Sequence, residues 1–203
     1  MNVIETTLTT KALFSDDDSK RYLLQKTWDT GKPKLAIIMM APSVAEGIAL
    51  DSTTLLVLNN ASRLGYGSVS IVNLFATLND FDLKEAESED VENMKVILNS
   101  AQEADAVVYA PGVGKAKNKA FMLRQNQVLT AIRPMESKLF CLTDADGNAR
   151  FQHPLSPSVR TWHLSPMKVE ELVKEPKKQE SKAESKEATQ EDSKTPKGKK
   201  SGK

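Results

Sequence analysis

The apolar stretches LAIIMM (Leu35–Met40) and SVSIVNLF (Ser68–Phe75) decide the predicted fold. Each has the length of a strand and almost no polar residue, which is typical of a strand buried on both faces. DAVVYA (Asp105–Ala110) and SKLFCL (Ser137–Leu142) share this character. The pattern therefore predicts four core strands, which span residues 35–40, 69–74, 106–110 and 138–142.

Segments with helical signals separate these strands. TTLLVLNNASRL (53–64) follows a good N-cap, Asp51 or Ser52, and ends at Gly65, while 91–104 and 117–132 repeat apolar residues at helical spacing. Alternation of strands and helices favours a parallel sheet covered on both faces. We therefore predict an α/β fold, a three-layer α/β/α domain with a central, mostly parallel sheet. RYLLQKTW (21–28) adds an N-terminal strand, expected to form a hairpin with the strand 35–40.

The C-terminal part of the chain has a different composition. Residues 168–203 contain 11 lysines and 8 acidic residues, and almost no large apolar residue follows Val173. Such a segment cannot bury enough surface to offset the entropy lost on ordering. We predict one domain over residues 1–167 and a disordered tail over 168–203. The tail either solubilises the protein or makes weak, salt-dependent contact with a polyanion such as nucleic acid.

Composition also restricts the location and the cofactors. No apolar run approaches the roughly 18–20 residues of a membrane span, and MNVIETTLTTK (1–11) lacks the regions of a signal peptide. We therefore expect a cytoplasmic protein without a membrane partner. One cysteine and two histidines make a poor zinc set, so neither a metal nor another cofactor is expected.

The loops that follow the core strands are the predicted site, because ligands of open parallel sheets bind beyond the carboxyl ends of the strands. The last of these loops contains ARFQHPLSP (149–157), in which Pro154 restricts the preceding His153 to extended geometry. A loop histidine can give a proton or a hydrogen bond to a leaving group near neutral pH. Asp51, in the loop after the first core strand, either orients a water molecule or only caps the following helix.

The other candidates are binding residues. Asn73 ends a buried strand and could read the donor–acceptor edge of a ligand, or cap the loop backbone. Phe75, expected on the same face, could stack on a planar ligand or pack in the core. Pro42 and Ser43 leave the first strand, where Ser43 donates a hydrogen bond or makes an ordinary turn; without G-x-S-x-G it does not resemble a hydrolase nucleophile. Gly112, in PGVGK, lets the backbone approach a ligand, although the stretch is not a P-loop.

Several of these motifs together resemble the bacterial and phage family known as domain of unknown function 1643. The family shows Asn-Pro-Ser, Asp-Asp-Pro-Thr, Gly-Tyr-Gly, Val-Asn-Leu-Phe, Trp-Gly and His-Pro-Leu in this order. Residues 65–67, 72–75 and 153–155 fit these motifs closely. The chain departs from them at Ala41, where the family has asparagine, and at Leu50, where it has aspartate. Ala110 or Pro111 stands where Trp-Gly would be.

The motif order is also similar to that of the uracil-DNA glycosylase superfamily. That resemblance implies that Asn73 reads a base, Phe75 stacks on it, His153 stabilises the leaving base, and the loop 41–51 places water. The first expected function is therefore a glycosylase-like protein that binds a nucleobase, a nucleotide or nucleic acid and hydrolyses an N-glycosidic bond. The alternative is a non-catalytic binding or interaction protein, favoured by Ala41 and Leu50.

Overall fold

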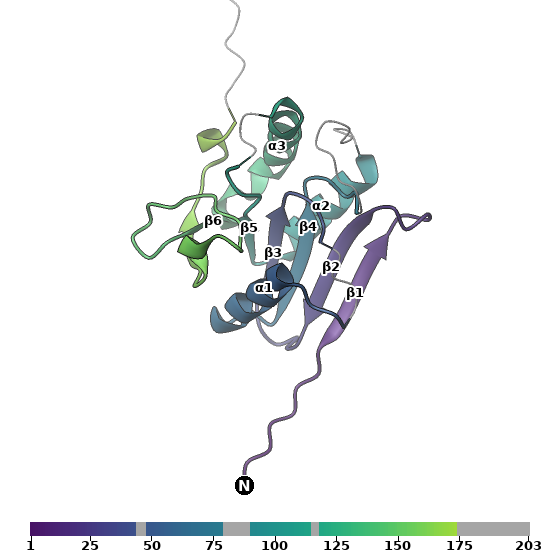
Figure 1. Ribbon diagram of the computed structural model, residues 1–203, viewed down its shortest axis with the longest axis vertical. Coiled ribbons are helices and arrows are strands. Elements are labelled where there is room, and N and C mark those ends of the chain that lie inside the picture. The colour runs from purple at the N-terminus through teal and green to yellow at the C-terminus, as the bar shows by residue number, and fades with distance from the viewer. Residues whose placement is uncertain (44–47, 79–89, 115–117, 174–203) are drawn as a thin grey trace, which may run out of the picture.

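One mixed sheet organises the part of the chain that the computed structural model describes, residues 1–43, 48–78, 90–114 and 118–173 (Figure 1). In these residues the sheet has seven strands, in the order β1-β2-β4-β3-β5-β6-β7. Their bounds are β1 (Thr9–Phe14), β2 (Arg21–Thr27), β3 (Lys34–Met39), β4 (Ser68–Asn73), β5 (Ala106–Tyr109), β6 (Leu139–Thr143) and β7 (His163–Pro166). Strands β4, β3, β5 and β6 are parallel neighbours, and β1, β2 and β7 are antiparallel to their neighbours.

The predicted hairpin between residues 21–28 and 35–40 is wrong. Strand β2 pairs with β1 and β4, whereas β3 lies between β4 and β5. The chain reverses direction between β2 and β3, but β4 lies between the two strands, and the amides of Trp28 and Asp29 both donate to the Gly67 carbonyl just before β4, at 2.9 and 3.0 Å. A Cβ atom on Gly67 would overlap the Asp29 carbonyl oxygen, so this close crossing requires glycine. The hairpin that does form joins β1 to β2.

Within the described residues, three α-helices lie between the parallel strands, as the sequence predicted: α1 (Ser52–Arg63), α2 (Val91–Glu103) and α3 (Lys119–Ile132). Each begins at a side chain that accepts a hydrogen bond from the first helical turn. Asp51 accepts from the Thr54 amide, Asp90 from the Asn93 amide and Asn118 from the Phe121 amide. These caps satisfy donors that a helix leaves unpaired at its start. Short 3-10 helices span η1 (Arg133–Lys138), η2 (Pro157–Val159) and η3 (Val169–Glu171).

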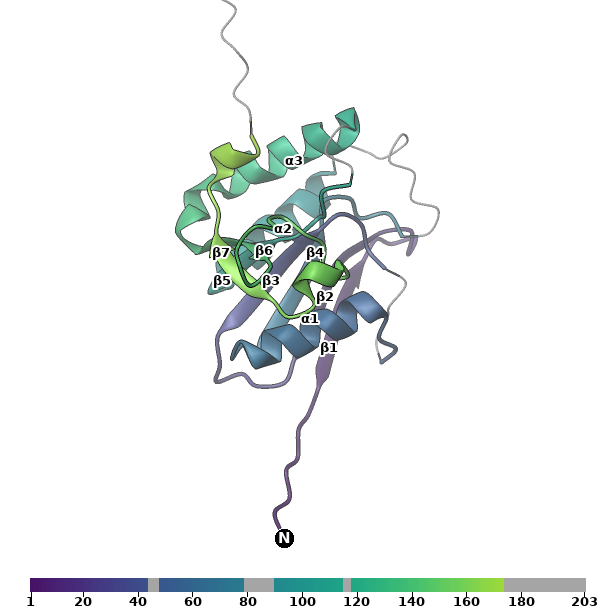
Figure 2. The same ribbon diagram turned by 60° about the vertical axis from the view of Figure 1, so that its left-hand side comes forward.

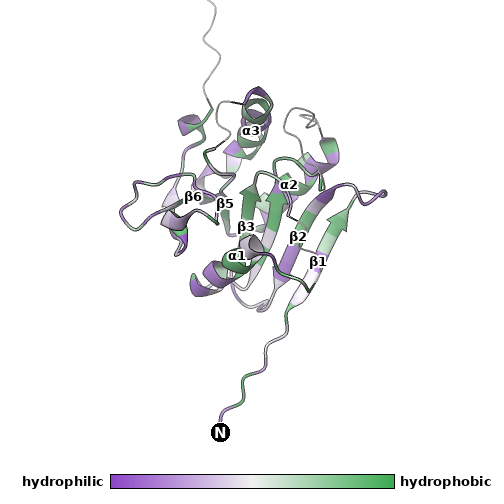
Figure 3. Ribbon diagram, viewed as in Figure 1, coloured by the Kyte–Doolittle hydropathy of each residue, from purple (hydrophilic) through white to green (hydrophobic). Residues whose placement is uncertain are grey.

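Apolar side chains pack on both faces of the sheet. Alternate residues of β3 point in opposite directions: Ile37 joins the cluster that contains Val57 of α1, and Ile38 joins the cluster that contains Ile97 of α2 and Val128 of α3. Figure 2 shows α1 on one side of the sheet and α2 with α3 on the other, and Figure 3 shows that the central strands are mainly hydrophobic. Burial on both faces explains why β3 and β4 read as nearly continuous apolar runs.

The packed structure extends past residue 167, where the sequence analysis placed the domain boundary. Val169 is fully buried, and its amide donates to Glu136 Oε2 at 2.9 Å. Glu171 pairs with Arg150 at 2.9 Å. The first residues of the predicted tail therefore belong to the fold, and residues 174–203 lie outside the described residues. No helix of the described part is long and apolar enough to cross a membrane.

Candidate functional site

The chain changes direction within the parallel sheet between β3 and β5. Strand β3 continues through α1 to β4, with α1 on one face, while β5 continues through α3 to β6, with α3 on the other. The loops that leave β3 and β5 therefore diverge at the carboxyl ends of adjacent strands. Such a switch point is where open α/β sheets bind their ligands. The topology therefore places the candidate site at the loops that contain Asp51 and Gly112.

His153 lies against Gly112, so the loop after β6 meets the loop after β5. A Cβ atom built on Gly112 would stand 3.2 Å from the His153 Cβ, and Gly112 has a φ of +84°, a backbone conformation that favours glycine. The amide of Leu155 donates to His153 Nδ1 at 3.2 Å. Because Nδ1 accepts, the neutral imidazole carries its proton on Nε2, which is then a hydrogen-bond donor.

Burial lowers the pKa of His153 below its ordinary value, and the negative charge of Asp51 opposes this shift. The imidazole is therefore mainly neutral at pH 7. Asp51 is near enough to act on His153 electrostatically, although the two residues come from different loops. The structure thus brings the two predicted catalytic residues, Asp51 and His153, to the same edge of the sheet, together with Gly112.

Asp51 caps α1 through one carboxylate oxygen, since Oδ1 accepts from the Thr54 amide at 2.7 Å. The other oxygen, Oδ2, is buried and accepts no hydrogen bond of good geometry from the described residues. Burial raises the pKa of this carboxyl, but the Ser43 hydroxyl and the Thr54 amide lower it by more, so it lies below its ordinary value. Asp51 is therefore an ionised group that the Ser43 hydroxyl and the Thr54 amide stabilise, in addition to being a helix cap.

Arg21, which the sequence analysis did not select, holds the loop that contains Pro42 and Ser43. The Arg21 side chain is only 2% exposed, and its Nη1 donates to the Ser43 carbonyl at 2.9 Å. Strand β2 runs antiparallel to β4, so its first residue lies at the carboxyl edge of the parallel strands. Nothing in the local sequence distinguishes Arg21 from a surface arginine at the start of a strand. Pro42 and Ser43 are both half-buried.

Asn73 is 1% exposed, and its Nδ2 has no hydrogen-bond partner among the described residues. A buried unpaired donor is uncommon in a folded protein and costs about 1–3 kcal/mol. The backbone around it is held firmly: Asn93 Nδ2 donates to the carbonyls of Asn73 and Leu74, each at 3.1 Å, and Arg124 Nε donates to the Leu74 carbonyl at 2.8 Å. Asn93 and Arg124 were also missed, because their partners are distant in sequence.

Phe75 does not share a face with Asn73, contrary to the expectation from their spacing. Phe75 is 2% exposed and packs in the cluster between the sheet, α2 and α3. Asn73 continues the alternation of Val69 and Ile71, which face α1. The chain leaves regular strand geometry after Asn73, so a two-residue spacing no longer keeps side chains on one face. In this structure Phe75 is a core residue with no ring face open to a ligand.

Residues 21–155 match the protein family described as "Protein of unknown function (DUF1643)". The match covers more than half of the chain. The chain belongs to this family. The matching region of this DUF1643 protein begins at Arg21, which holds the Ser43 loop, and ends at Leu155, whose amide binds His153. No curated protein and no solved structure matches the chain.

The candidate site of this DUF1643 protein thus consists of two groups of residues. Asp51, Gly112 and His153 gather at the switch point, and Ser43 lies beside Asp51. Asn73 ends β4, the strand next to β3 in the sheet. The described residues contain no group of three or more histidine, cysteine or acidic side chains placed to hold a metal ion.

Proposed function

We propose that this DUF1643 protein binds a nucleobase, either free or as part of a nucleotide or nucleic acid, at the carboxyl edge of the parallel strands. Its proposed reaction is hydrolysis of an N-glycosidic bond, in a manner similar to the uracil-DNA glycosylase superfamily. The observation that carries the proposal is the meeting of Asp51, Gly112 and His153, which come from three separate loops, at the switch point of the sheet.

The chemistry of these side chains suits such a ligand. A nucleobase edge offers both donors and acceptors, and the Asn73 amide can match both, with an Nδ2 that has no partner among the described residues. His153 Nε2 is a neutral donor suited to a carbonyl oxygen of the base. The apolar clusters on both faces also support the predicted three-layer arrangement around four parallel core strands, which holds the loops in fixed positions.

In the proposed reaction, a water molecule attacks the anomeric carbon of the sugar while the bond to the base nitrogen breaks. The bonding electron pair leaves with the base, and the water gives its proton to Asp51. The lowered pKa of Asp51 keeps the carboxylate ionised, and Oδ2 is the oxygen free to accept that proton. His153 stabilises the negative charge on the departing base by donating a hydrogen bond from Nε2.

A second candidate function is nucleobase binding without hydrolysis. Ala41 and Leu50 occupy positions at which the resembled motifs have asparagine and aspartate. Position 41 lies two residues after the end of β3 and belongs to the loop that would place the attacking water. A family member that lacks a polar group at position 41 can still bind a nucleobase without hydrolysing the N-glycosidic bond.

The test is to incubate the protein with oligonucleotides and nucleotides that carry normal and modified bases and to detect released base by mass spectrometry. Asp51→Asn is the sharpest variant, because asparagine caps a helix as well as aspartate does but cannot take a proton from water. His153→Gln removes the imidazole. Asn59→Ala, on the exposed side of α1, is the matched control.

Base release by the wild type and the control, with loss in Asp51→Asn and His153→Gln, supports the hydrolytic function. Binding without release, weakened by Asn73→Ala and His153→Gln, supports the second candidate. If no base is bound or released, or if the variants behave like the wild type, the proposed site is wrong.

A further inference from the structure

The His153 loop is connected to α1 through one buried side chain, Asn60. Asn60 lies in the helix that begins at Asp51, and it is 4% exposed. Its Nδ2 donates to the Leu56 carbonyl at 2.9 Å and to the Arg160 carbonyl at 3.0 Å, and its Oδ1 accepts from the Trp162 amide at 2.9 Å. The amide therefore binds the backbone of residues 160–162 as a neighbouring β-strand would.

This connection is specific to asparagine. Both hydrogens on Nδ2 have carbonyl acceptors, and Oδ1 has an amide donor, so the side chain uses its full donor capacity. Asparagine is not a favoured residue inside a helix, because its side chain competes for backbone hydrogen bonds. At position 60 the side chain instead binds backbone groups of Arg160 and Trp162, which belong to another segment of the chain.

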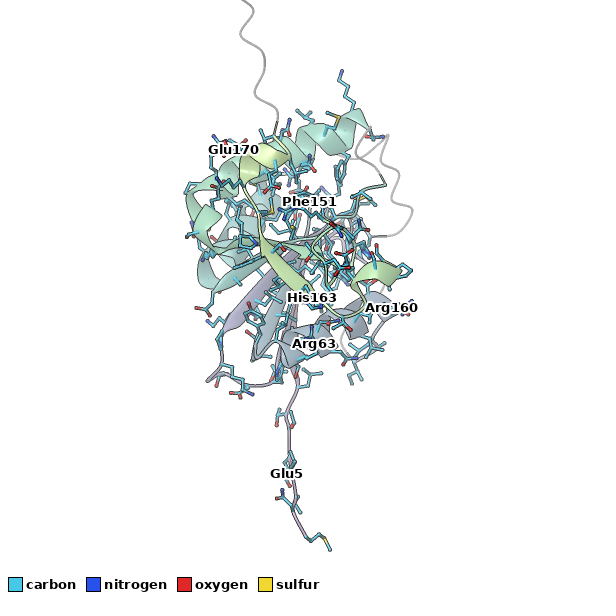
Figure 4. All side chains as sticks on the ribbon, turned by 90° about the vertical axis from the view of Figure 1, so that its left-hand side faces the viewer. Glu5, Arg63, Phe151, Arg160, His163 and Glu170 are labelled. Atoms are coloured by element: carbon cyan, nitrogen blue, oxygen red, sulfur yellow. The ribbon has the colours of Figure 1, made fainter. Side chains whose placement is uncertain are left out.

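Arg63 strengthens the same contact from the next turn of α1. Its Nη2 donates to the Trp162 carbonyl at 2.7 Å. Figure 4 labels Arg63 together with Arg160 and His163, which come before and after Trp162 in the chain. Trp162 itself is 1% exposed, and its indole nitrogen has no partner among the described residues. Hydrogen bonds to its backbone, together with apolar packing, hold it in place.

The chain between this contact and His153 has little freedom. The Ser156 amide donates to the His153 carbonyl at 2.8 Å, and the Val159 amide donates to the Ser156 carbonyl at 3.0 Å. Val159 is fully buried, and Pro154 and Pro157 each fix a backbone φ angle. Two hydrogen-bonded turns therefore join residues 160–162 to His153.

We propose that Asn60 is a positioning residue that sets the place of His153 relative to Asp51. Helix α1 carries Asp51 at its start, and through Asn60 and Arg63 it holds the segment that leads back to His153. One rigid helix thus fixes two side chains that belong to different loops. The inference rests on the site assigned in the proposed function, but its test needs no substrate.

The experiment measures the electrostatic coupling between Asp51 and His153 by NMR titration of the imidazole. The chain has only two histidines, and His163→Gln identifies the second signal. In the wild type, Asp51→Asn should lower the pKa of His153, because the charge of Asp51 raises it. In an Asn60→Ala background the same Asp51→Asn change should have little effect. Asn59→Ala, exposed on the same helix, should leave the coupling intact.

Amide exchange gives an independent measurement. Loss of the hydrogen bond that the Trp162 amide donates to Asn60 Oδ1 should speed exchange of this amide by about tenfold in the folded protein. The inference is wrong if the coupling persists in Asn60→Ala, if Asn59→Ala removes it equally, or if exchange at Trp162 is unchanged.

If Asn60→Ala does not fold, Asn60→Ser, which keeps a small polar side chain but loses both Nδ2 hydrogen bonds, replaces it in both measurements. Each coupling is the difference that Asp51→Asn makes within one background, so any shift that the substitution at position 60 causes by itself cancels. A weaker coupling supports the inference, and an unchanged one overturns it. If wild-type protein neither binds nor releases a nucleobase while the coupling is present, only the proposed function fails.

Discussion

Replacement of Gly112 by alanine tests whether the loop after β5 sets the position of His153. The new Cβ atom would meet two constraints. The backbone has a φ of +84°, where a side chain costs about 1–2 kcal/mol, and the Cβ would stand only 3.2 Å from the His153 Cβ. The second contact requires the histidine or the glycine loop to shift, at a further cost of about 1 kcal/mol. We expect Gly112→Ala to lower the free energy of unfolding by about 2–3 kcal/mol.

Two other glycines separate these contributions. Gly147 has a φ of +77° and Gly65 a φ of +87°, and a Cβ at either position would have nothing within 4 Å. Gly147→Ala and Gly65→Ala therefore carry the backbone strain without the contact to His153, and each should cost about 1–2 kcal/mol. The excess loss in Gly112→Ala measures the contact alone.

Urea unfolding gives the three free energies, and an NMR titration follows the His153 imidazole in each variant. Only Gly112→Ala should change the pKa of His153, because only that side chain reaches it. The reasoning is refuted if Gly112→Ala costs no more than Gly147→Ala and leaves the His153 signals unchanged.

Three further predictions follow from single residues. Phe75→Ala should lower the free energy of unfolding by about 3–5 kcal/mol in urea, with little change in the ligand affinity of the folded protein. Asp51→Asn should change stability by less than about 0.5 kcal/mol, whereas Asp51→Ala should cost about 1 kcal/mol by loss of the cap. Because the pKa of His153 is lower in the folded state, its contribution to stability is complete above a pH of about 6.5 and is lost as the pH falls through the folded pKa. His153→Gln should remove that dependence in urea unfolding curves measured between about pH 5 and 7.

Local sequence patterns determined the helices and the buried strands. The three helices begin at Asp51, Asp90 and Asn118, and each cap binds an amide only three residues away. The strands β3 and β4 read as apolar runs because both of their faces are covered. These signals depend on near neighbours and on total burial, so a single sequence contains them. The edge of the sheet that carries the candidate site follows from the same information.

Contacts between residues distant in the sequence determine the strand order and the positions of several buried side chains. The place of β2 beside β4 depends on Gly67, which binds the backbone after β2, and no local pattern marks that pairing. The Phe75 side chain lies in the core because regular strand geometry ends at Asn73, so the two side chains do not point to the same face. Arg21 and Asn60 resemble ordinary surface residues in the sequence, yet both are buried and hold the backbone of another loop.

Local patterns in the sequence are therefore enough to predict which loops form the candidate site, whereas the side chains that meet in those loops follow from the fold. Periodicity and capping act over a few residues, so they are visible in a single sequence. The meeting of Asp51, Gly112 and His153 depends instead on strand order and on long-range hydrogen bonds to buried backbone groups, such as those from Asn60.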